Sequence, residues 1–439
     1  MMGSVNKVVS SRDKQEYEFR PFTLKQHLPR NKDGQIPKGR SGHRIASDNT
    51  FLYSFGGFNP LLDEDEIRNN DTDGDMKLFK ELWRFNFATS EWHKMTEFGK
   101  SLPHELASNA LLMNGSMLIV HGGTGVPFGF TCSNKTYISN LKRDKSLTLL
   151  KTDGSLPRPQ YGQSMALDGH KLYVIGGTSG FEYSSDIHCL DLKTNVWEAT
   201  YICKGKNYFE PAGRYRHEVA FYNSKIIVFG GGTVDAAFGF NVSNHYYQLK
   251  ILLKTVILKF LFQKLPAFNV KTNEWELLTT LPDPEMVGDD EHDGYPLPRR
   301  CHGSVQVPED ENQDPEFIIC GGYDGKEIFS DIWKLNLKTL QWTCFAEELA
   351  NPLYFHATSL SPCGQMFIFG GICEIYNDES DNDNVTIRTN EIFSMWIKIP
   401  KLSEICWDAM LYYNPNLSKC PKSRLLKNGV PLEFVNRVA

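Results

Sequence analysis

Acidic side chains are the first residues of this chain whose spacing suggests chemistry. They gather in three stretches, at residues 63–75, 289–293 and 374–383. Asp71, Asp73 and Asp75 come nearest to the alternating carboxylates of a calcium-binding loop. Gly74 stands in the wrong place for such a loop, and no glutamate follows at its twelfth position. We therefore interpret the three stretches as solvated loops, and we predict no metal site.

Histidines and cysteines do not form a catalytic or redox motif either. The ten cysteines include no C-x-x-C pair, so neither a zinc ribbon nor a redox pair is indicated. Four histidines recur at regular spacing: His43, His217, His302 and His356. They fall in separate repeat units, so we expect them to donate structural hydrogen bonds and not to converge on a metal ion. Because G-x-S-x-G, Walker and Rossmann motifs are also missing from the sequence, we predict no catalytic residues and no cofactor.

Composition and charge restrict the class of protein. With 41% hydrophobic and 23% charged residues the chain is typical of a globular protein. A net charge of −6 argues against nucleic-acid or membrane-surface partners, which usually require a basic excess. The first 20 residues show no apolar signal-peptide core, which favours the cytosol or the nucleus.

Six apolar runs, each closed by a glycine pair, provide the elements that must position any site. The pairs end at Gly57, Gly123, Gly177, Gly231, Gly322 and Gly371. Each run has the length of a strand and is rich in β-branched and aromatic residues. A tryptophan follows four of the pairs, at Trp92, Trp197, Trp275 and Trp342. The pairs therefore mark one repeated unit that the chain uses six times.

A unit of roughly 50 residues with four strands, a double glycine and a spaced aromatic residue is the kelch signature. One such sheet has two apolar faces, which it buries by packing radially against neighbouring blades. The sequence predicts an all-β fold, a six-bladed kelch β-propeller, over residues 16–400. We expect a disordered segment at 1–15 and a short helical tail at 401–439.

Two blades depart from the repeat. Blade two has no histidine at the expected place, and Leu147 stands near the position of the missing tryptophan. Blade six lacks its final strand, which would leave an open sheet edge. We predict that the N-terminal run 16–24 supplies this outer strand and closes the ring.

Blade four contains an anomalous insertion at residues 242–263. The interval from Gly231 to Trp275 is 44 residues, and removal of these 22 residues restores ordinary spacing. Val242 and Ser243 at its start and Gln263 at its end are compatible with the codons of intron boundaries. We interpret the segment as a retained intron or gene-model error, or as a rare isoform. A genuine amphipathic loop helix is the alternative.

The tail changes the apolar period from two to about 3.6, which predicts an amphipathic helix. Leu402, Cys406 and Met410 recur every four residues, with Ile405 beside them, and Pro415 ends the helix. A second apolar helix is predicted around Leu425 and Leu426. Because a closed propeller leaves little core for these side chains to join, we expect the first helix to dock on another protein.

The tail resembles two short partner-binding boxes. The stripe of Leu402, Ile405, Cys406 and Met410 resembles the BC box that binds elongin C, and Pro415 with Leu417 resembles a cullin-2 box. Lys401, Met410 and Asn414 depart from the usual residues of these boxes. Together with RSGHRIASDNTFLYSFGG, KELWRFNFATSEWHKM and CGGYDG, this tail makes the chain resemble the kelch-repeat substrate receptors of cullin-2 RING ubiquitin ligases.

That resemblance implies a non-catalytic adaptor. Its partners would be elongin B, elongin C, cullin-2 and a RING subunit, and it would bind the free C-termini of substrate proteins ending in Gly or Ala. Less directly, it implies suppression of a Ser/Thr phosphatase in oxidative-stress kinase signalling. An interaction scaffold without ligase activity is the second hypothesis. A copper oxidase of similar architecture is the third, although the chain offers no convincing Cys–Tyr–His–His set.

The repeat also separates scaffold residues from candidate binding residues. Arginine recurs three residues before the histidine at Arg40, Arg214 and Arg299, and we predict a structural role for these three. Further arginines occur once each, and a guanidinium is the natural bidentate partner of a buried carboxylate. Tyr161 and Tyr354 lie in corresponding segments and would leave room only for a small terminal residue. The predicted substrate site is Arg44, Tyr161, Arg216, Arg300 and Tyr354. Plain surface charges on the blades are the alternative.

Overall fold

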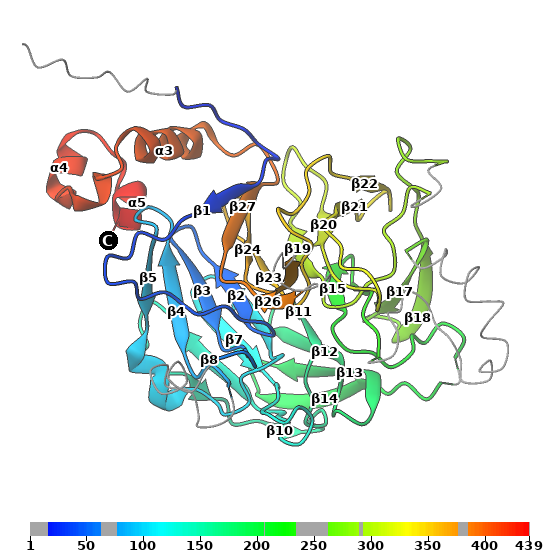
Figure 1. Cartoon of the computed structure of the whole chain (residues 1–439). Helices are drawn as coiled ribbons and strands as arrows, with labels where there is room; N and C mark the ends of the chain where they lie inside the picture. The colour runs from blue at the N-terminus through cyan, green and yellow to red at the C-terminus, as the bar shows by residue number, and fades with distance from the viewer. Residues whose placement is uncertain are drawn as a thin grey trace, which may run out of the picture.

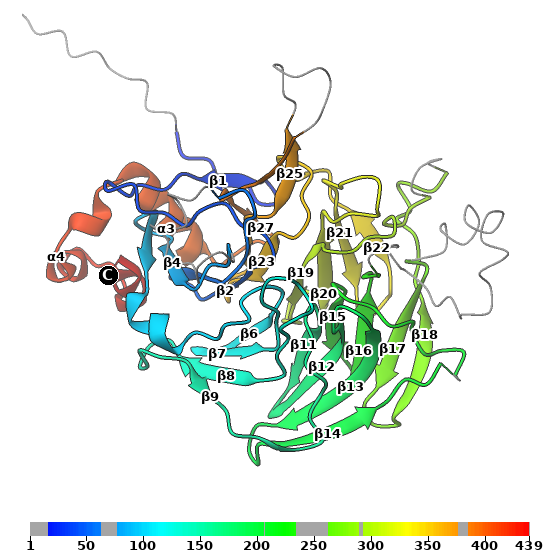
Figure 2. The same ribbon diagram turned by 60° about the horizontal axis from the view of Figure 1, so that its bottom comes forward.

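The computed structural model describes residues 16–62, 77–205, 207–233, 262–288, 293–375 and 385–438. The predicted disordered segment 1–15 and most of the three acidic stretches lie outside these residues. Six of the β-sheets in the described residues are arranged as blades around a common centre (Figure 1 and Figure 2). The predicted six-bladed kelch propeller is confirmed.

Each blade contains four antiparallel strands, here in order from the innermost strand outward. Blade one holds β2 (Arg44–Ser47), β3 (Phe51–Phe55), β4 (Leu82–Asn86) and β5 (Glu91–Lys94). Blade two holds β6 (Ala110–Asn114), β7 (Met117–His121), β8 (Thr136–Asn140) and β9 (Thr148–Leu149). Blade three holds β11 (Ser164–Asp168), β12 (Lys171–Thr178), β13 (Tyr183–Asp191) and β14 (Val196–Tyr201), with β10 (Asp153–Gly154) added in parallel at its edge.

The second half of the ring repeats this plan. Blade four holds β15 (Glu218–Tyr222), β16 (Lys225–Phe229), β17 (Lys264–Asn269) and β18 (Glu274–Thr279). Blade five holds β19 (Gly303–Val307), β20 (Glu316–Cys320), β21 (Ile332–Asn336) and β22 (Trp342–Cys344). Blade six holds β23 (Ala357–Leu360), β24 (Gln365–Phe369), β27 (Ile392–Trp396) and β1 (Lys25–His27). A short helix η2 (Thr96–Ser101) follows β5, and the hairpin of β25 (Ile372–Ile375) and β26 (Val385–Arg388) projects from blade six (Figure 2).

An N-terminal strand closes the ring, as predicted, but it lies further along the chain than expected. Strand β1 pairs antiparallel with β27, and Lys25 stands opposite Ser394. The sequence placed this strand within residues 16–24. Pro21 and Phe22 form a turn instead, with Phe22 at a φ of 59°, so the extended pairing begins only after them. The Phe22 N–H still donates to the Trp396 carbonyl, 2.9 Å away.

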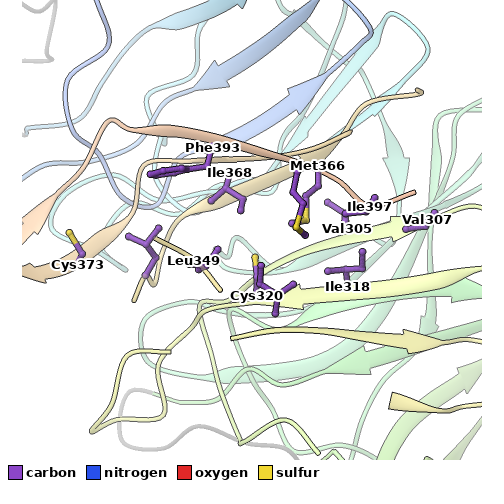
Figure 3. Close-up of a cluster of buried hydrophobic side chains, with 13 residues drawn as sticks. Val305, Val307, Ile318, Cys320, Leu349, Met366, Ile368, Cys373, Phe393 and Ile397 are labelled. Carbon is purple, nitrogen blue, oxygen red and sulfur yellow. The ribbon is translucent and has the colours of Figure 1, made fainter. Parts of the chain in front are cut away.

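The hydrophobic core lies between neighbouring blades. Each tryptophan that follows a glycine pair packs on the blade that precedes its own: Trp92 on blade six, Trp197 on blade two, Trp275 on blade three and Trp342 on blade four. Leu147 is buried in the corresponding place between blades two and one. Figure 3 shows the interface of blades five and six, where Val305 and Ile318 face Met366 and Ile368. The blades are therefore held together mainly by burial of apolar surface.

The glycine pairs are required by the contacts between blades. At the pair of blade six, a Cβ on Gly370 would lie 2.6 Å from the imidazole of His43, which belongs to the next blade. A Cβ on Gly371 would lie 2.7 Å from Cβ of His356. His43 shares a hydrogen bond with the Phe369 carbonyl through Nε2, and burial keeps its pKa well below the ordinary value. This histidine is therefore neutral and structural, as the sequence predicted.

Only the last two residues of the predicted insertion 242–263 lie within the described part of the chain. Residues 242–261 lie outside the described residues, whereas Phe262 and Gln263 belong to blade four. Phe262 is fully buried beside Trp342, and its carbonyl accepts a hydrogen bond from the hydroxyl of Thr280. Phe262, within the predicted insertion 242–263, therefore contributes to the core of blade four, which spacing alone does not show.

Two deletions are expected to separate the insertion from the blade. Deleting 242–261 should change the melting temperature by no more than about 2 °C, because the interval then approaches that of the other blades and the buried Phe262 is kept. Deleting 242–263 also removes Phe262, and loss of a buried phenylalanine costs about 3–5 kcal/mol, which should lower the melting temperature by several degrees. Differential scanning calorimetry of both variants checks this. Equal melting temperatures for the two deletions would contradict a core role for Phe262.

The tail is helical and has a small core of its own. It comprises α3 (Leu402–Tyr413), η5 (Leu417–Lys419), α4 (Lys422–Lys427), α5 (Leu432–Val435) and η6 (Asn436–Val438). Trp407 of α3 packs with Leu425, Phe434 and Val435, and Ala88 of blade one packs against this cluster. Both predicted helices are therefore present. No helix in the described part of the chain is long and apolar enough to cross a membrane.

Candidate functional site

Six corresponding segments, one before each innermost strand, meet at one end of the propeller. We call them the lead-in segments: residues 40–44, 106–110, 160–164, 214–218, 299–303 and 353–357. The third residue of every segment has a left-handed backbone, with φ between 53° and 67°. These residues are Gly42, Ser108, Gly162, Arg216, Cys301 and Phe355. Such φ values favour glycine, yet four of the six carry side chains, so the position is maintained by the ring and not by residue preference.

A closed circle of backbone hydrogen bonds explains this shared conformation. The N–H of each third residue donates to the carbonyl of the third residue in the preceding blade, at distances of 2.7 to 3.3 Å around all six blades. We call this circle the central ring. It satisfies backbone groups that would otherwise be buried without partners at the axis. The four side chains at this position are thereby brought together, although they are far apart in sequence: Ser108, Arg216, Cys301 and Phe355.

Arg216 is the most unusual member of the central ring. Its guanidinium is buried, with 3% of the residue exposed, and lies 4.8 Å above the Phe355 ring. One terminal nitrogen donates to the Ser108 hydroxyl, whereas Nε has no hydrogen-bond partner among the described residues. Burial, followed by the nearby charge of Arg44, lowers the pKa of Arg216 to about 10. Arg216 therefore remains a buried cation that lacks a carboxylate partner in the described chain.

Arg44 is already neutralised by the chain itself. It projects from β2 of blade one and pairs with Glu218 of β15, on the opposite blade, at 3.2 Å. Its Nε also donates to the Asn109 carbonyl. The pair lies next to the central ring and holds two opposite blades together. Arg44 therefore has a carboxylate partner already in place, whereas the described residues supply none for Arg216.

Arg300 and Tyr354 lie together on the neighbouring blades five and six. Arg300 donates to the Thr233 carbonyl, and its guanidinium lies 5.6 Å above the ring of Tyr323. Tyr323 in turn stacks on Tyr354, with ring centroids 5.1 Å apart. Arg300 and Tyr354 occupy the second place of their lead-in segments, one residue before the central ring. The structure thus places both beside Cys301 and Phe355 of the ring.

Tyr161 occupies the equivalent place in blade three. It contacts Tyr215 edge-on, with centroids 6.3 Å apart, and Tyr215 immediately precedes Arg216. Burial raises the pKa of Tyr161, so its hydroxyl is protonated and available as a donor at neutral pH. All five predicted substrate residues therefore lie in the lead-in segments, but they occupy three different places within them: the second, the third and the fifth.

The recurring arginines are structural, as predicted. Arg40 and Arg299 each donate to the carbonyl of the first glycine of their own blade, and each is paired with a carboxylate, Glu81 and Asp331 respectively. Arg214 makes the same contact with the Gly230 carbonyl. These arginines tie the lead-in segment to the glycine pair.

Sequence reasoning missed Ser108, Glu218 and Phe355. Ser108 and Phe355 contact the Arg216 guanidinium, and Glu218 binds Arg44. Aligning the six lead-in segments would have placed Ser108, Arg216 and Phe355 in one column. Residues in that column meet at the axis of the propeller, and this relation becomes visible only when the six segments are compared. Among the described residues, no group of three or more His, Cys, Asp or Glu side chains is placed to hold a metal ion.

The tail presents a second candidate surface. Leu402 is 74% exposed, and Cys406, one turn later, is also exposed. Ile405 is half-buried, and Met410 is half-buried against the tail core. Leu417 is buried in that core, while Pro415 is exposed. The apolar stripe predicted from the sequence is therefore divided: its first turns face outward, whereas Met410 and Leu417 help to hold the tail together.

The N-terminal segment and blade one hold α3 in position on the propeller. The Tyr17 hydroxyl donates to Asp408, 3.0 Å away, and Lys25 of β1 pairs with the same carboxylate at 3.3 Å. Arg437 forms a two-pronged ion pair with Glu404, and its carbonyl accepts a hydrogen bond from Asn86 of blade one. The exposed turns of α3 thus have a defined orientation relative to the blades.

Comparison with known proteins gives the family. The KLHDC2/KLHL20/DRC7 Kelch-repeats domain matches residues 2–231, and the Attractin/LZTR1 beta-propeller matches residues 172–403. The Drosophila melanogaster Kelch domain-containing protein 10 homolog is 40% identical over 455 residues, covering 99% of this chain and 69% of the relative. Kelch domain-containing protein 10 of Homo sapiens is 39% identical over 404 residues, covering 92% and 80%. The same-named protein of Rattus norvegicus is 39% identical over 414 residues, covering 94% and 88%.

These matches agree with the blades, the glycine pairs and the lead-in segments described above. The similarity extends through both the propeller and the tail, since it covers nearly the whole chain. The protein is thus a kelch-repeat scaffold, and the chain belongs to the Kelch domain-containing protein 10 family.

Proposed function

We propose that this chain is the substrate-recognition subunit of a cullin-2–elongin B/C RING ubiquitin ligase. In this role it is a non-catalytic adaptor in the cytosol or nucleus, and it binds substrate C-termini that end in Gly or Ala. The propeller holds the substrate, and α3 docks on elongin C. The chemistry of ubiquitin transfer belongs to the partners.

The outward face of α3 is the observation that carries this proposal. The tail already has a core that buries Trp407, Leu425 and Phe434, and yet Leu402 and Cys406 remain exposed on its first helix. Large apolar side chains on a well-held helix are typical of a helix that inserts into a groove of a partner. The contacts of Asp408 and Glu404 hold this helix at a defined angle, which suits an adaptor that must present a substrate.

The central ring supports the second half of the proposal. A peptide that ends in a free carboxylate would supply the anion that Arg216 lacks, with the Ser108 hydroxyl as an additional donor. A guanidinium in a buried setting binds a carboxylate far more strongly than one in water. Phe355 contacts the guanidinium, and Tyr354 contacts Phe355 in turn. Together with Tyr161, which contacts the residue before Arg216, these rings would leave little room for a bulky terminal side chain.

Affinity purification of the full chain and of a chain ending at Lys401 tests the ligase assignment. The full chain should recover elongin B, elongin C and cullin-2 from a cell lysate, and the shortened chain should recover none of them, because α3 is missing. Thermal melting of the shortened chain verifies that its propeller is folded. If the full chain is purified without elongins, the ligase assignment is wrong, and an interaction scaffold that suppresses a Ser/Thr phosphatase becomes the leading alternative.

A further inference from the structure

Three exposed phenylalanines form a second feature near the central ring. Phe128 and Phe130 lie on the connection between β7 and β8 of blade two, and Phe181 lies on the turn between β12 and β13 of blade three. Their exposed fractions are 45%, 75% and 77%. The rings of Phe130 and Phe181 contact each other edge-on, with centroids 6.3 Å apart. We call these three residues the aromatic ledge.

The two loops that carry the ledge are held tightly against each other. Gly129 and Gly180 meet backbone to backbone, so closely that a Cβ on Gly129 would lie 2.9 Å from the Cα of Gly180. The N–H of Gly129 donates to the Thr124 hydroxyl, and the Gly180 N–H donates to that of Thr178. A side chain at either glycine would force the loops apart. The ledge is therefore preformed, which reduces the entropy lost when a ligand binds.

The ledge continues without interruption to the central ring. Phe128 contacts Phe58 of blade one at 5.0 Å and Tyr161 of blade three at 6.4 Å, so it bridges across blade two. Tyr161 then contacts Tyr215, the residue before Arg216. Ring contacts thus lead along an aromatic path from Phe128 of the ledge to Tyr215, whose neighbour in sequence is Arg216 of the central ring. The charged side chains next to Phe181 do not add a net charge, because Glu182 is paired with Arg158.

We propose that the aromatic ledge binds a large apolar side chain of the substrate, upstream of a C-terminal residue whose carboxylate lies at Arg216. The occupant is thus the extended C-terminal segment of a substrate protein, with an apolar anchor at one end and a negative charge at the other. This inference rests on the proposed function, because it takes Arg216 as the partner of the terminal carboxylate.

The spacing of the two ends follows from the aromatic path. Centroid steps of 6.4 Å and 6.3 Å lead from Phe128 to Tyr215. An extended peptide advances about 3.3 Å per residue, so about four residues cover this path. The ledge therefore selects substrates by an apolar residue about four to five positions before the terminus, whereas the ring selects the terminal residue itself.

A scan of peptides by fluorescence polarisation tests this with the full-length protein. A single phenylalanine is moved from the second to the eighth position before a terminal glycine in an otherwise Ser- and Asn-rich peptide. Affinity should rise by about tenfold when the phenylalanine reaches the fourth or fifth position, compared with serine there. In the variant Phe130→Ser/Phe181→Ser this rise should vanish. Tyr208→Ser, a change at a 71% exposed aromatic residue of another loop, should leave it intact.

The outcomes separate the ledge from the ring. If the free acid is preferred over the amide but the position of the phenylalanine has no effect, the ledge proposal is overturned and the C-terminus proposal stands. If acid and amide bind equally, the C-terminus proposal fails, and an apolar preference that persists shows an internal motif, which also overturns the ledge as stated here. Because Phe130 and Phe181 are largely exposed, their replacement should not change the melting temperature.

Discussion

Leu402→Asp is expected to abolish the recovery of elongin B and elongin C with this protein. An apolar side chain that fills a pocket of a partner typically contributes at least about 2 kcal/mol, and a carboxylate in its place adds a desolvation cost. We therefore expect the affinity for purified elongin B/C to fall by at least about 30-fold. Isothermal titration calorimetry measures this loss directly, and co-purification from cells measures it in the assembled ligase.

Leu432→Asp is the matched control for this change. Leu432 is the same residue type on α5 of the same tail, and it is 61% exposed. Neither substitution removes a buried contact, so both variants should keep the melting temperature of the parent protein. Only Leu402→Asp should lose the elongins. Equal loss for both variants, or undiminished binding by Leu402→Asp, would refute the assignment of α3 as the elongin-binding helix.

Arg216→Ala should remove the preference for a free C-terminus. A substrate carboxylate that pairs with this buried guanidinium loses its partner in the variant, which typically costs about 2–5 kcal/mol, or a factor of about 30 to several thousand in affinity. Amidation of the peptide removes the same interaction, because the peptide then has no terminal carboxylate. The parent protein should therefore discriminate strongly between the acid and the amide of a Gly-ended peptide, whereas Arg216→Ala should bind both weakly and equally.

Other arginines provide the comparisons for this experiment. Arg300→Ala should also weaken the free-acid peptide, because its segment adjoins the ring. Arg40→Ala should mainly lower the melting temperature, because it leaves the buried carboxylate of Glu81 without its guanidinium, a loss of about 3–5 kcal/mol. Fluorescence polarisation measures the affinity of all three variants for the acid and amide peptides, and thermal melting measures the stability of Arg40→Ala. Equal affinity of the parent protein for acid and amide would exclude recognition of the C-terminus.

In the tail, the apolar stripe of α3 could be interpreted only once the burial of its side chains was known. Its sequence predicts a helix with Leu402, Cys406 and Met410 on one face, and the helix is present. The sequence does not show that Trp407 and Met410 pack in the core of the tail. Of the predicted stripe, only Leu402 and Cys406 therefore remain exposed. Helical periodicity identifies an apolar face, but only the tertiary packing decides which part of that face is already covered.

The sequence by itself determined the six blades and most of their scaffold. Glycine pairs, tryptophans and recurring arginines predict the fold because each lies within one repeat of about 50 residues, and six copies of a local pattern leave little ambiguity. The same regularity identified the closing N-terminal strand, although the turn at Pro21 and Phe22 moved it to Lys25–His27. It also predicted the insertion at 242–263, whereas only the structure shows that Phe262 is buried in the core.

Only the tertiary structure decided what the three singular arginines do. Arg44, Arg216 and Arg300 look alike in sequence, yet Arg44 pairs with Glu218 on the opposite blade, Arg300 binds a carbonyl of the neighbouring blade, and Arg216 alone lies buried in the central ring. These differences arise from contacts between residues up to 174 positions apart in the chain. Radial closure of the ring brings them together, and a pattern that repeats within each blade carries no information about what meets across the axis.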